Sequence, residues 1–314
     1  MERYIFGIDL GGTTVKLGLF TKQGGLAEKW EIPTRTENGG AHILPDLQQA
    51  VFDCLQRHGL DASQVLGIGL GVPGAVLEDR FVKPCVNLNG WGGDVAGMLS
   101  ALCGLPVKAV NDANAAALGE LWQGGGRGCR NMVFVTLGTG VGGGVIVDGK
   151  LLSGVHGCGG EIGHMKIFAD DPQACGCGKR GCLEQYASAT GIVREAGRWL
   201  LVSDRPSALR SFGRLTAKDV LDCAKAGDEL AAEVARTFAD CLGRALATVS
   251  CVCDPEVFVL GGGVSKAGQY LLDLVQPAFA RYAFPPAEET AFRLAELGND
   301  AGIYGAAKLV FDGA

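Results

Sequence analysis

The chain has 314 residues, enough for two domains of ordinary size, and its apolar content of 47% is typical of a globular protein. No apolar run reaches the ~18 residues that a membrane-spanning helix needs, which argues against a membrane partner. The net charge of −6, without a basic cluster, argues against nucleic acid as a partner. The first residues lack the features of a signal peptide, so we expect a cytoplasmic protein whose twelve cysteines are mainly small core residues.

The first predicted elements, within residues 4–20, are a strand, a tight glycine turn and a second strand. The turn reads Asp-Leu-Gly-Gly-Thr-Thr and contains Asp9, Gly11, Gly12, Thr13 and Thr14. Its backbone N–H groups and hydroxyls suit the phosphates of a nucleotide, and the carboxylate suits a hydrated Mg²⁺. A plain hairpin turn explains the two glycines equally well.

The same pattern recurs over residues 131–152, at an offset of 127 residues. Here the turn between the two strands is Gly138-Thr139-Gly140. A repeated phosphate-type turn predicts two related halves that face one nucleotide.

A third glycine loop, Gly261-Gly262-Gly263, follows an apolar strand and precedes a helix expected to begin near Ser265. It suits close approach by the adenosine end of the nucleotide, although close packing of helix on strand is an alternative.

Residues 105–124 predict a strand, a loop and a helix that continues to Trp122. Asn111 or Asp112 is expected at the helix N-cap. Since Asn111 is already a good cap, we predict that Asp112 is an active-site carboxylate rather than a cap.

The stretch from Cys158 to Ser188 contains the largest group of candidate metal ligands and binding carboxylates in the sequence. Cys175, Cys177 and Cys182 follow His164, and three thiolates with one imidazole form a closed tetrahedral set for structural Zn²⁺. Three ordinary buried thiols are the alternative. Glu161 and Glu184 flank this set, so a bound metal would fix both carboxylates relative to each other.

The remaining sequence predicts helices. Residues 215–253 form two amphipathic stretches separated at Gly227-Asp228, and residues 285–311 form a loop, a strand over 291–297 and a closing helix from Ala301. Residues 194–214 are expected to be a surface excursion. His42 and His58 are expected at the surface, and the sequence leaves open whether His156 joins the site.

These motifs resemble those of one known family. DLGGTTVK, GVPG, NDANAAALGE, LGTGVGGGVI, GEIGHM, CGCGKRGCLEQYAS, VLGGGVS and NDAGIYGAA occur in the order found in the ROK family of bacterial sugar kinases and repressors. The resemblance runs from about Ile8 to Ala307 and is strongest to zinc-containing glucokinases. It implies the actin-like ATPase (ribonuclease H-like) fold, with two α/β domains around a central cleft. We expect a small domain over residues 1–115, joined by the helix of 301–314, and a large domain over 116–300 with a zinc module at 164–182.

The resemblance also implies roles for the matching residues. Asp112 would be the catalytic base. The sugar would contact Asn87, Asn111, Asp112, Glu161, His164 and Glu184. ATP with Mg²⁺ would contact Asp9, Gly11, Gly12, Thr13, Thr14, Gly138, Thr139, Gly140, Gly261, Gly262 and Gly263. Zn²⁺ would be held by His164, Cys175, Cys177 and Cys182.

The expected function is ATP-dependent phosphorylation of a hexose, foremost glucose to glucose 6-phosphate. Fructose, N-acetylmannosamine, N-acetylglucosamine and allose are alternative substrates, and a sugar-sensing protein or an actin-like ATPase is an alternative class. Repressor members carry a DNA-reading segment ahead of the first glycine turn, and only eight residues precede Asp9, so we expect no DNA binding. The resemblance further implies a homo-oligomer, either a dimer or a tetramer.

Overall fold

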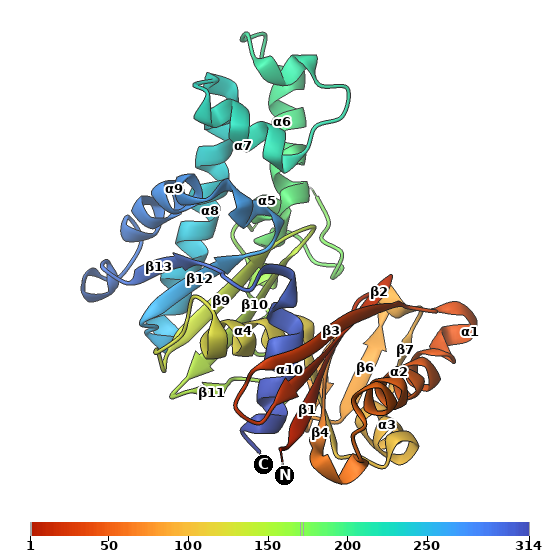
Figure 1. The fold of residues 1–314 in the computed structure, drawn as a ribbon. Coiled ribbons are helices and arrows are strands. Elements are labelled where there is room, and N and C mark those ends of the chain that lie inside the picture. The colour runs from red at the N-terminus through yellow and green to blue at the C-terminus, as the bar shows by residue number, and fades with distance from the viewer. Residues whose placement is uncertain (1, 170, 172, 314) are drawn as a thin grey trace. The chain divides into compact units, whose positions relative to one another are not determined.

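The computed structural model describes residues 2–169, 171 and 173–313, and these form two compact units. Within the described residues, unit 1 comprises the chain up to Gly128, the segment Leu151–Gly160 and the chain from Leu297 onward. Unit 2 comprises Cys129–Lys150 and Glu161–Glu296. Each unit is an α/β structure built on a five-stranded sheet (Figure 1).

The sheet of unit 1 has the strand order β3-β2-β1-β4-β8. The first three strands along the chain pair antiparallel, whereas β1, β4 and β8 pair parallel. The strands are β1 (Tyr4–Leu10), β2 (Thr14–Thr21), β3 (Leu26–Pro33), β4 (Val65–Val72) and β8 (Val107–Asn111). A separate small sheet contains β5 (Val76–Leu77), β6 (Phe81–Cys85) and β7 (Trp91–Gly93).

The alternation of side chains along β1 divides the sheet into two packed faces. Phe6, Ile8 and Leu10 pack in one core with the helices α2 (Ile43–His58) and α3 (Val95–Cys103), which lie on the same side of the sheet in Figure 1. Ile5 packs on the opposite face, in a core with α10 (Ala301–Phe311). Since Asp9 follows Ile5 by four residues, its side chain belongs to the α10 face.

The backbone of helix α10 packs directly against the backbones of the strands and of α4 (Asp112–Gln123), and glycines make this close packing possible. A Cβ atom on Gly7 would lie 2.0 Å from the carbonyl oxygen of Ile303, and one on Gly69 would lie 1.8 Å from that of Ala306. On the helix itself, a Cβ on Gly305 would lie 1.6 Å from the Ala115 carbonyl oxygen. These distances are far below van der Waals contact, so no larger residue fits at these positions without moving the backbone.

The buried side chain of Glu120, near the end of α4, binds the backbone near the point where the chain first leaves unit 1 and at the point where it finally returns. Its Oε2 accepts the backbone N–H of Gly125 at 2.8 Å, and its Oε1 accepts that of Leu297 at 2.9 Å. A Cβ on Gly124 would lie 2.0 Å from Oε2. The chain first passes into unit 2 after Gly128 and returns for the last time at Leu297, so one side chain fixes the backbone near both of these passages.

The sheet of unit 2 has the order β11-β10-β9-β12-β13, which repeats the order of unit 1 strand for strand. Its strands are β9 (Met132–Leu137), β10 (Val141–Val147), β11 (Lys150–Leu151), β12 (Val257–Gly261) and β13 (Ala291–Leu294). Leu10 pairs with Val15 in unit 1, and Leu137 pairs with Val141 in unit 2. The internal repeat predicted from the sequence is therefore present, with a turn one residue shorter in the second copy.

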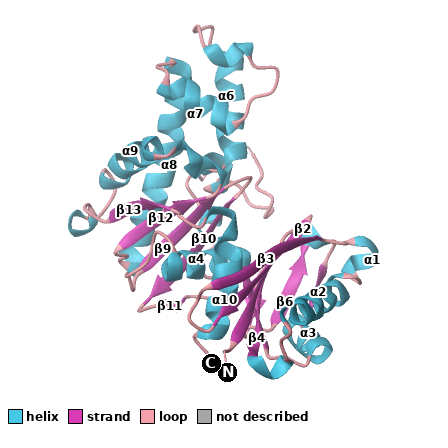
Figure 2. Cartoon of the chain, in the orientation of Figure 1, coloured by secondary structure: helices cyan, strands magenta, loops and turns pink. Residues whose placement is uncertain are grey.

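The helices of unit 2 are α5 (Glu184–Ala187), α6 (Ala189–Val202), α7 (Ala217–Lys225), α8 (Glu229–Cys253) and α9 (Gln269–Ala280). Figure 2 shows α6 to α9 gathered together, and their apolar residues share one core with β9 and β12. Three expectations need correction. Helix α6 occupies the first part of the presumed surface excursion, because its Ile192 and Ala196 are buried while Arg198 is exposed. A 3-10 helix (Gly263–Ala267) precedes α9, and β13 ends at Leu294.

Among the residues that the structure describes, no helix combines the length and the apolar composition needed to cross a membrane.

Candidate active site

In unit 1 the polar candidates gather at the carboxyl ends of neighbouring parallel strands. Asp9 is next to last in β1 and pairs in register with Gly71 of β4, while Val72 of β4 pairs with Asn111, the last residue of β8. The carboxyl ends of parallel strands are the usual place for ligand sites in α/β sheets. The structure thus brings Asp9, Asn111 and Asp112 to one edge of one sheet.

The N-cap of α4 is Asn111, not Asp112. The Asn111 backbone is extended, and its side-chain Oδ1 accepts the N–H groups of Ala113 and Asn114 at 3.0 and 3.1 Å. Its amide nitrogen donates to the Gly74 carbonyl at 3.2 Å and to Asp112 Oδ1 at 3.0 Å. The asparagine therefore performs the capping role that was the structural alternative for Asp112.

Asp112 is the first residue of α4, and its side chain is exposed. Its Oδ1 accepts the N–H of Ala113 at 2.8 Å. The positive end of the helix dipole stabilises a carboxylate at this position. The result is a solvent-accessible acceptor held at a defined place, with a helix end that favours its charged form.

Asp9 lies against the first turn of α10, where a Cβ on Gly302 would be only 2.6 Å from Asp9 Oδ2. Burial, and after it the negative charge of Asp112, raise the pKa of Asp9 to about 6, although Lys16 on β2 acts in the opposite direction. Two neighbouring carboxylates that repel each other attract a cation, and a bound cation would lower the pKa of Asp9 and so favour its ionised form.

The first glycine turn is both a hairpin turn and an open surface. Gly11 N–H donates to the Thr14 carbonyl at 3.1 Å, and Thr34 Oγ1 donates to the Gly11 carbonyl at 2.7 Å. Gly12 and Thr13 are exposed at its tip. Asn87, in a 3-10 helix (Val86–Leu88), is exposed beside it, since a Cβ on Gly12 would lie 3.6 Å from the Asn87 carbonyl oxygen.

The two glycines of the second turn, in unit 2, differ in whether a side chain would fit. A Cβ on Gly138 would meet nothing within 4 Å, whereas one on Gly140 would lie 2.2 Å from Glu184 Oε2. The same Glu184 oxygen accepts the N–H of Val141 at 3.1 Å. Thr190 Oγ1 donates to the Thr139 carbonyl at 2.6 Å, so the turn is tied to the start of α6.

The third glycine loop packs directly on the second turn. Gly262 has φ +82°, and a Cβ there would lie 2.6 Å from the backbone N and O of Leu137. A Cβ on Gly261 would lie 2.9 Å from the Phe134 ring, but Gly263 faces open space. Close packing, the alternative considered from the sequence, thus explains Gly261 and Gly262, and Gly263 is the loop's open position.

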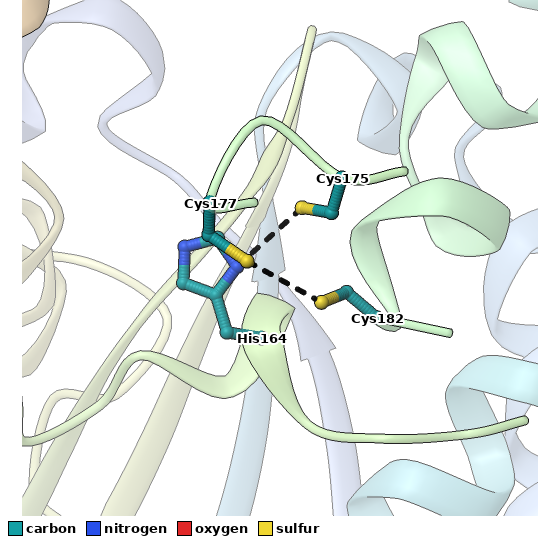
Figure 3. Close-up of side chains that lie close together, drawn as sticks. All are labelled: His164, Cys175, Cys177 and Cys182. Atoms are coloured by element: carbon teal, nitrogen blue, oxygen red, sulfur yellow. Dashed lines mark hydrogen bonds between the residues drawn. The ribbon is translucent and has the colours of Figure 1, made fainter. Parts of the chain in front are cut away.

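The predicted metal ligands of unit 2 converge. One ligand atom each from His164, Cys175, Cys177 and Cys182 lies within 4.8 Å of the others (Figure 3). Cys177 Sγ and Cys182 Sγ are 3.7 Å apart, and Cys175 Sγ is 3.8 Å from His164 Nδ1. Tetrahedral zinc with its usual bond lengths separates two sulfurs by about 3.8 Å and a sulfur from a nitrogen by about 3.6 Å. The distances and the donor chemistry fit zinc.

Both flanking carboxylates contact this cluster. Glu161 Oε2 is 3.9 Å from His164 Nε2, and Glu184 Oε1 is 3.6 Å from Cys175 Sγ. Lys166, which sequence reasoning missed, donates to Cys182 Sγ at 3.0 Å and to the Arg180 carbonyl at 2.6 Å. Its position two residues after His164 was the available signal. His156 is exposed in unit 1, and its carbonyl accepts the Cys158 thiol at 3.5 Å.

Comparison with known proteins gives matches along nearly the whole chain. The model of the ROK family matches residues 5–312. The glucokinase of Halalkalibacterium halodurans is 43% identical over 314 residues, which cover 98% of this chain and 95% of that protein. A ROK family glucokinase from Streptomyces griseus, solved with glucose and AMPPNP, superposes with a TM-score of 0.77 at 33% identity and covers 98% of both chains.

A ROK family transcriptional regulator, a homologue of the E. coli MLC protein, superposes with a TM-score of 0.86 at 26% identity. That match covers 99% of this chain and 79% of the regulator. Kinases and regulators of the family therefore share this architecture, and the predicted fold class, the actin-like ATPase fold, is confirmed. With the family's pattern matched from residue 5 to residue 312, the chain belongs to the ROK family.

Proposed function

We propose that this protein is an ATP-dependent hexose kinase that converts glucose to glucose 6-phosphate. Similarity to glucokinases over the whole chain supports the reaction and the sugar. The observation that carries the proposal is the state of Asp112. It is exposed at the first residue of α4, and Asn111 rather than Asp112 caps the helix, so the cap alone does not explain a carboxyl group at this place.

Asp112 accepts the proton of the attacking sugar hydroxyl. Its place at the start of α4 favours the charged form before the reaction, and its contact with the Asn111 amide orients it. Phosphoryl transfer depends chiefly on positioning and charge stabilisation, and a bound Mg²⁺ supplies charge neutralisation on the phosphates. Asp9 would hold this ion through its hydration shell, which agrees with the cation-attracting pair that Asp9 and Asp112 form.

The glycine turns would bind ATP. Gly11, Gly12, Thr13 and Thr14 present open backbone and hydroxyls in unit 1. Gly138, Thr139 and Gly140 would bind ATP in unit 2, where Gly138 is the open glycine, with the loop Gly261–Gly263 toward the adenosine. The support comes from Gly138 and Gly263, whose Cβ positions are open although neighbouring glycines are closely packed.

The sugar would be gripped by Asn87, Asn111, Glu161, His164 and Glu184. Glu184 also accepts Val141 N–H, and Glu161 lies beside the His164 imidazole, so both carboxylates are oriented by the fold. A sugar that lacks one of the recognised hydroxyls would leave one of these groups without its partner in the complex, which disfavours that sugar. Fructose, N-acetylmannosamine, N-acetylglucosamine and allose remain alternative substrates, because similar carboxylates bind all of them.

His164, Cys175, Cys177 and Cys182 would hold a structural zinc ion. Three thiolates and an imidazole leave no open position for a reacting water, so zinc stays outside the chemistry. Its contribution is rigidity, because the ligand His164 follows Glu161 by three residues and the ligand Cys182 precedes Glu184 by two.

The family resemblance also leads us to expect a dimer or tetramer and a cytoplasmic location. Light scattering on the purified protein and fractionation of cells test these expectations. The functional domains expected over residues 1–115 with 301–314, and over 116–300, are likewise a proposal, which limited proteolysis with and without glucose tests.

The decisive experiment measures ADP release across a panel of hexoses. A glucokinase releases ADP only when glucose is added, and the ratio kcat/KM ranks the sugars. ADP release without any sugar would indicate an actin-like ATPase. Sugar binding by calorimetry without ADP release would indicate a sugar-sensing protein.

A further inference from the structure

A second group of metal-ligand side chains lies in unit 1, on β3 and α2. Glu28 comes from the strand, and Cys54 and His58 come from the helix. One ligand atom from each lies within 4.8 Å of the other two. His58 Nε2 is 2.6 Å from Glu28 Oε2, and the Cys54 thiol is 3.5 Å from the same oxygen. Three different donor types thus point at one place.

The local structure produces this convergence. Cys54 and His58 are four residues apart in a 16-residue helix, so their side chains lie on one face, one turn apart. Arg57, on the same helix, binds the other carboxylate oxygen of Glu28: its Nη2 is 2.6 Å from Glu28 Oε1, and its guanidinium lies 5.5 Å from the centre of the Trp30 ring. Arg57 occupies Oε1 and leaves Oε2 directed at Cys54 and His58.

We propose that Glu28, Cys54 and His58 bind a divalent transition-metal ion of the zinc type, with water as the fourth ligand. A sulfur, an imidazole nitrogen and a carboxylate oxygen are the donors that such borderline ions accept, and three protein ligands plus water form an open tetrahedral site. Cys54 is fully buried, whereas the side chains of Glu28 and His58 are 26% and 34% exposed. The ion therefore lies at the edge of the core, where water reaches one side.

Charge and protons balance in this site. On binding, the Cys54 thiol releases its proton to solvent and His58 coordinates as the neutral imidazole, so thiolate and carboxylate together neutralise a divalent ion. The direct contact between His58 and Glu28 gives way to two metal–ligand bonds. Arg57 remains on the second carboxylate oxygen as an outer-sphere partner that fixes the orientation of Glu28.

The competing explanation is an ion pair among Glu28, Arg57 and His58 that needs no metal. Cys54 separates the two explanations. In the ion pair the Cys54 thiol only donates a weak hydrogen bond to Glu28 Oε2, and Cys54→Ala leaves all three charged or ionisable members in place. A metal site loses its soft ligand in the same variant.

A bound ion would fasten the edge of the sheet. In unit 1 β3 is the outermost strand next to β2, and the ion would link it to α2, which packs on the sheet. The three residues take no part in the proposed transfer reaction, so the expected effect is on stability rather than on kcat.

Cobalt titration of the purified full-length protein tests the site, because cobalt bound to a thiolate absorbs in the near ultraviolet. Wild type should gain this absorption, and Cys54→Ala and His58→Gln should lose the same part of it. Cys103→Ala, which removes a buried thiol of the same unit on α3, should keep it. Cobalt entering the cysteine cluster of unit 2 contributes equally to all four proteins, so only the difference counts.

Zinc content gives a second readout. After dialysis against zinc, wild type should hold one ion more per chain than Cys54→Ala, and its affinity at this site should exceed that of His58→Gln by more than about 100-fold, the upper range for outer-sphere changes. Equal zinc content and equal cobalt absorption in wild type and Cys54→Ala would overturn the proposal. If Cys54→Ala does not fold, His58→Gln decides by the same measurements, because its side chain is partly exposed. Neither readout needs kinase activity, so the result is independent of the proposed function.

Discussion

Replacement of Asp112 by Asn separates its chemical role from a structural one. The amide has the shape of the carboxylate but cannot accept a proton. Both hydrogen bonds of the Asn111 cap survive, and the amide oxygen can still accept the N–H of Ala113. What is lost is the attraction between a charge and the helix dipole, about 0.3–1 kcal/mol. Removing the repulsion with Asp9 works in the opposite direction. The free energy of unfolding should therefore change by less than about 1 kcal/mol.

The effect on catalysis should be several times larger. A general base contributes about 10²–10⁴ in rate. At about 1.36 kcal/mol per factor of ten, this raises the barrier by about 2.7–5.4 kcal/mol. A loss of kcat by this factor, in a protein of nearly normal stability, is the signature expected of a base.

Three measurements on Asp112→Asn decide the matter. They are ADP release at saturating glucose and ATP, glucose affinity by calorimetry, and thermal unfolding. A matched control is Asp94→Asn, which also removes a carboxylate, here a partly exposed one, at a helix start of unit 1, the N-cap of α3. The control should lose some stability, because Asp94 pairs with Arg80, yet keep its kcat. A fall in kcat below tenfold in folded Asp112→Asn would refute the base role and direct attention to Glu161.

Three further predictions follow from named contacts. Burial and Asp112 raise the pKa of Asp9 from 3.8 to about 6, so the folded protein binds this proton more tightly than the unfolded chain. The free energy of unfolding is therefore highest below pH 3.8 and falls by up to about 3 kcal/mol as the pH rises through 6. Asp9→Asn should therefore be more stable than wild type at pH 7 and similar at pH 4 in urea unfolding, and equal curves at pH 7 would contradict this. Cys177→Ser should lower zinc content from about one ion per chain and lower the Tm, and a zinc-free wild type of normal stability would disprove the zinc site. A Cβ at position 138 would meet no atom within 4 Å, so Gly138→Val should fold normally. Its ATP affinity, measured by calorimetry, should fall at least about tenfold while glucose still binds. Unchanged ATP affinity would show that the turn is only a hairpin turn.

The repeat was predictable from sequence because the two hairpins share one pattern of apolar strands and glycine turns. Asp9 of β1 and Thr136 of β9 occupy equivalent places, each paired with a glycine of the neighbouring parallel strand, Gly71 and Gly261. Helix α6 was missed because the stretch 194–214, into which it runs, is rich in arginine and serine, although Ile192 and Ala196 have helical spacing. The composition of a surface segment reflects mainly its exposed residues, whereas the spacing of its buried residues shows that it is a helix.

In the site, local chemistry was predictable and long-range pairing was not. The spacing of the cysteines predicted that they converge. Which of the two possible residues caps α4 is shown only by the extended backbone of Asn111. His58 was expected at the surface, and it is exposed there, but its partner Glu28 comes from a strand 30 residues earlier. The buried Glu120 had no signal beyond its place in a motif, because Gly125 and Leu297 bind it through backbone groups that any residue carries.

The packing of α10 has a consequence for synthesis on the ribosome. This helix follows all of unit 2 in the chain, yet it covers one face of the sheet that the first strands form. Until it emerges, Gly7 and Gly69 lack the carbonyl groups against which they are packed in the finished protein. Unit 2 lies in two segments that are both translated before α10. The unit whose synthesis begins first is thus completed last, and the nascent chain carries an uncovered sheet face while its second unit folds.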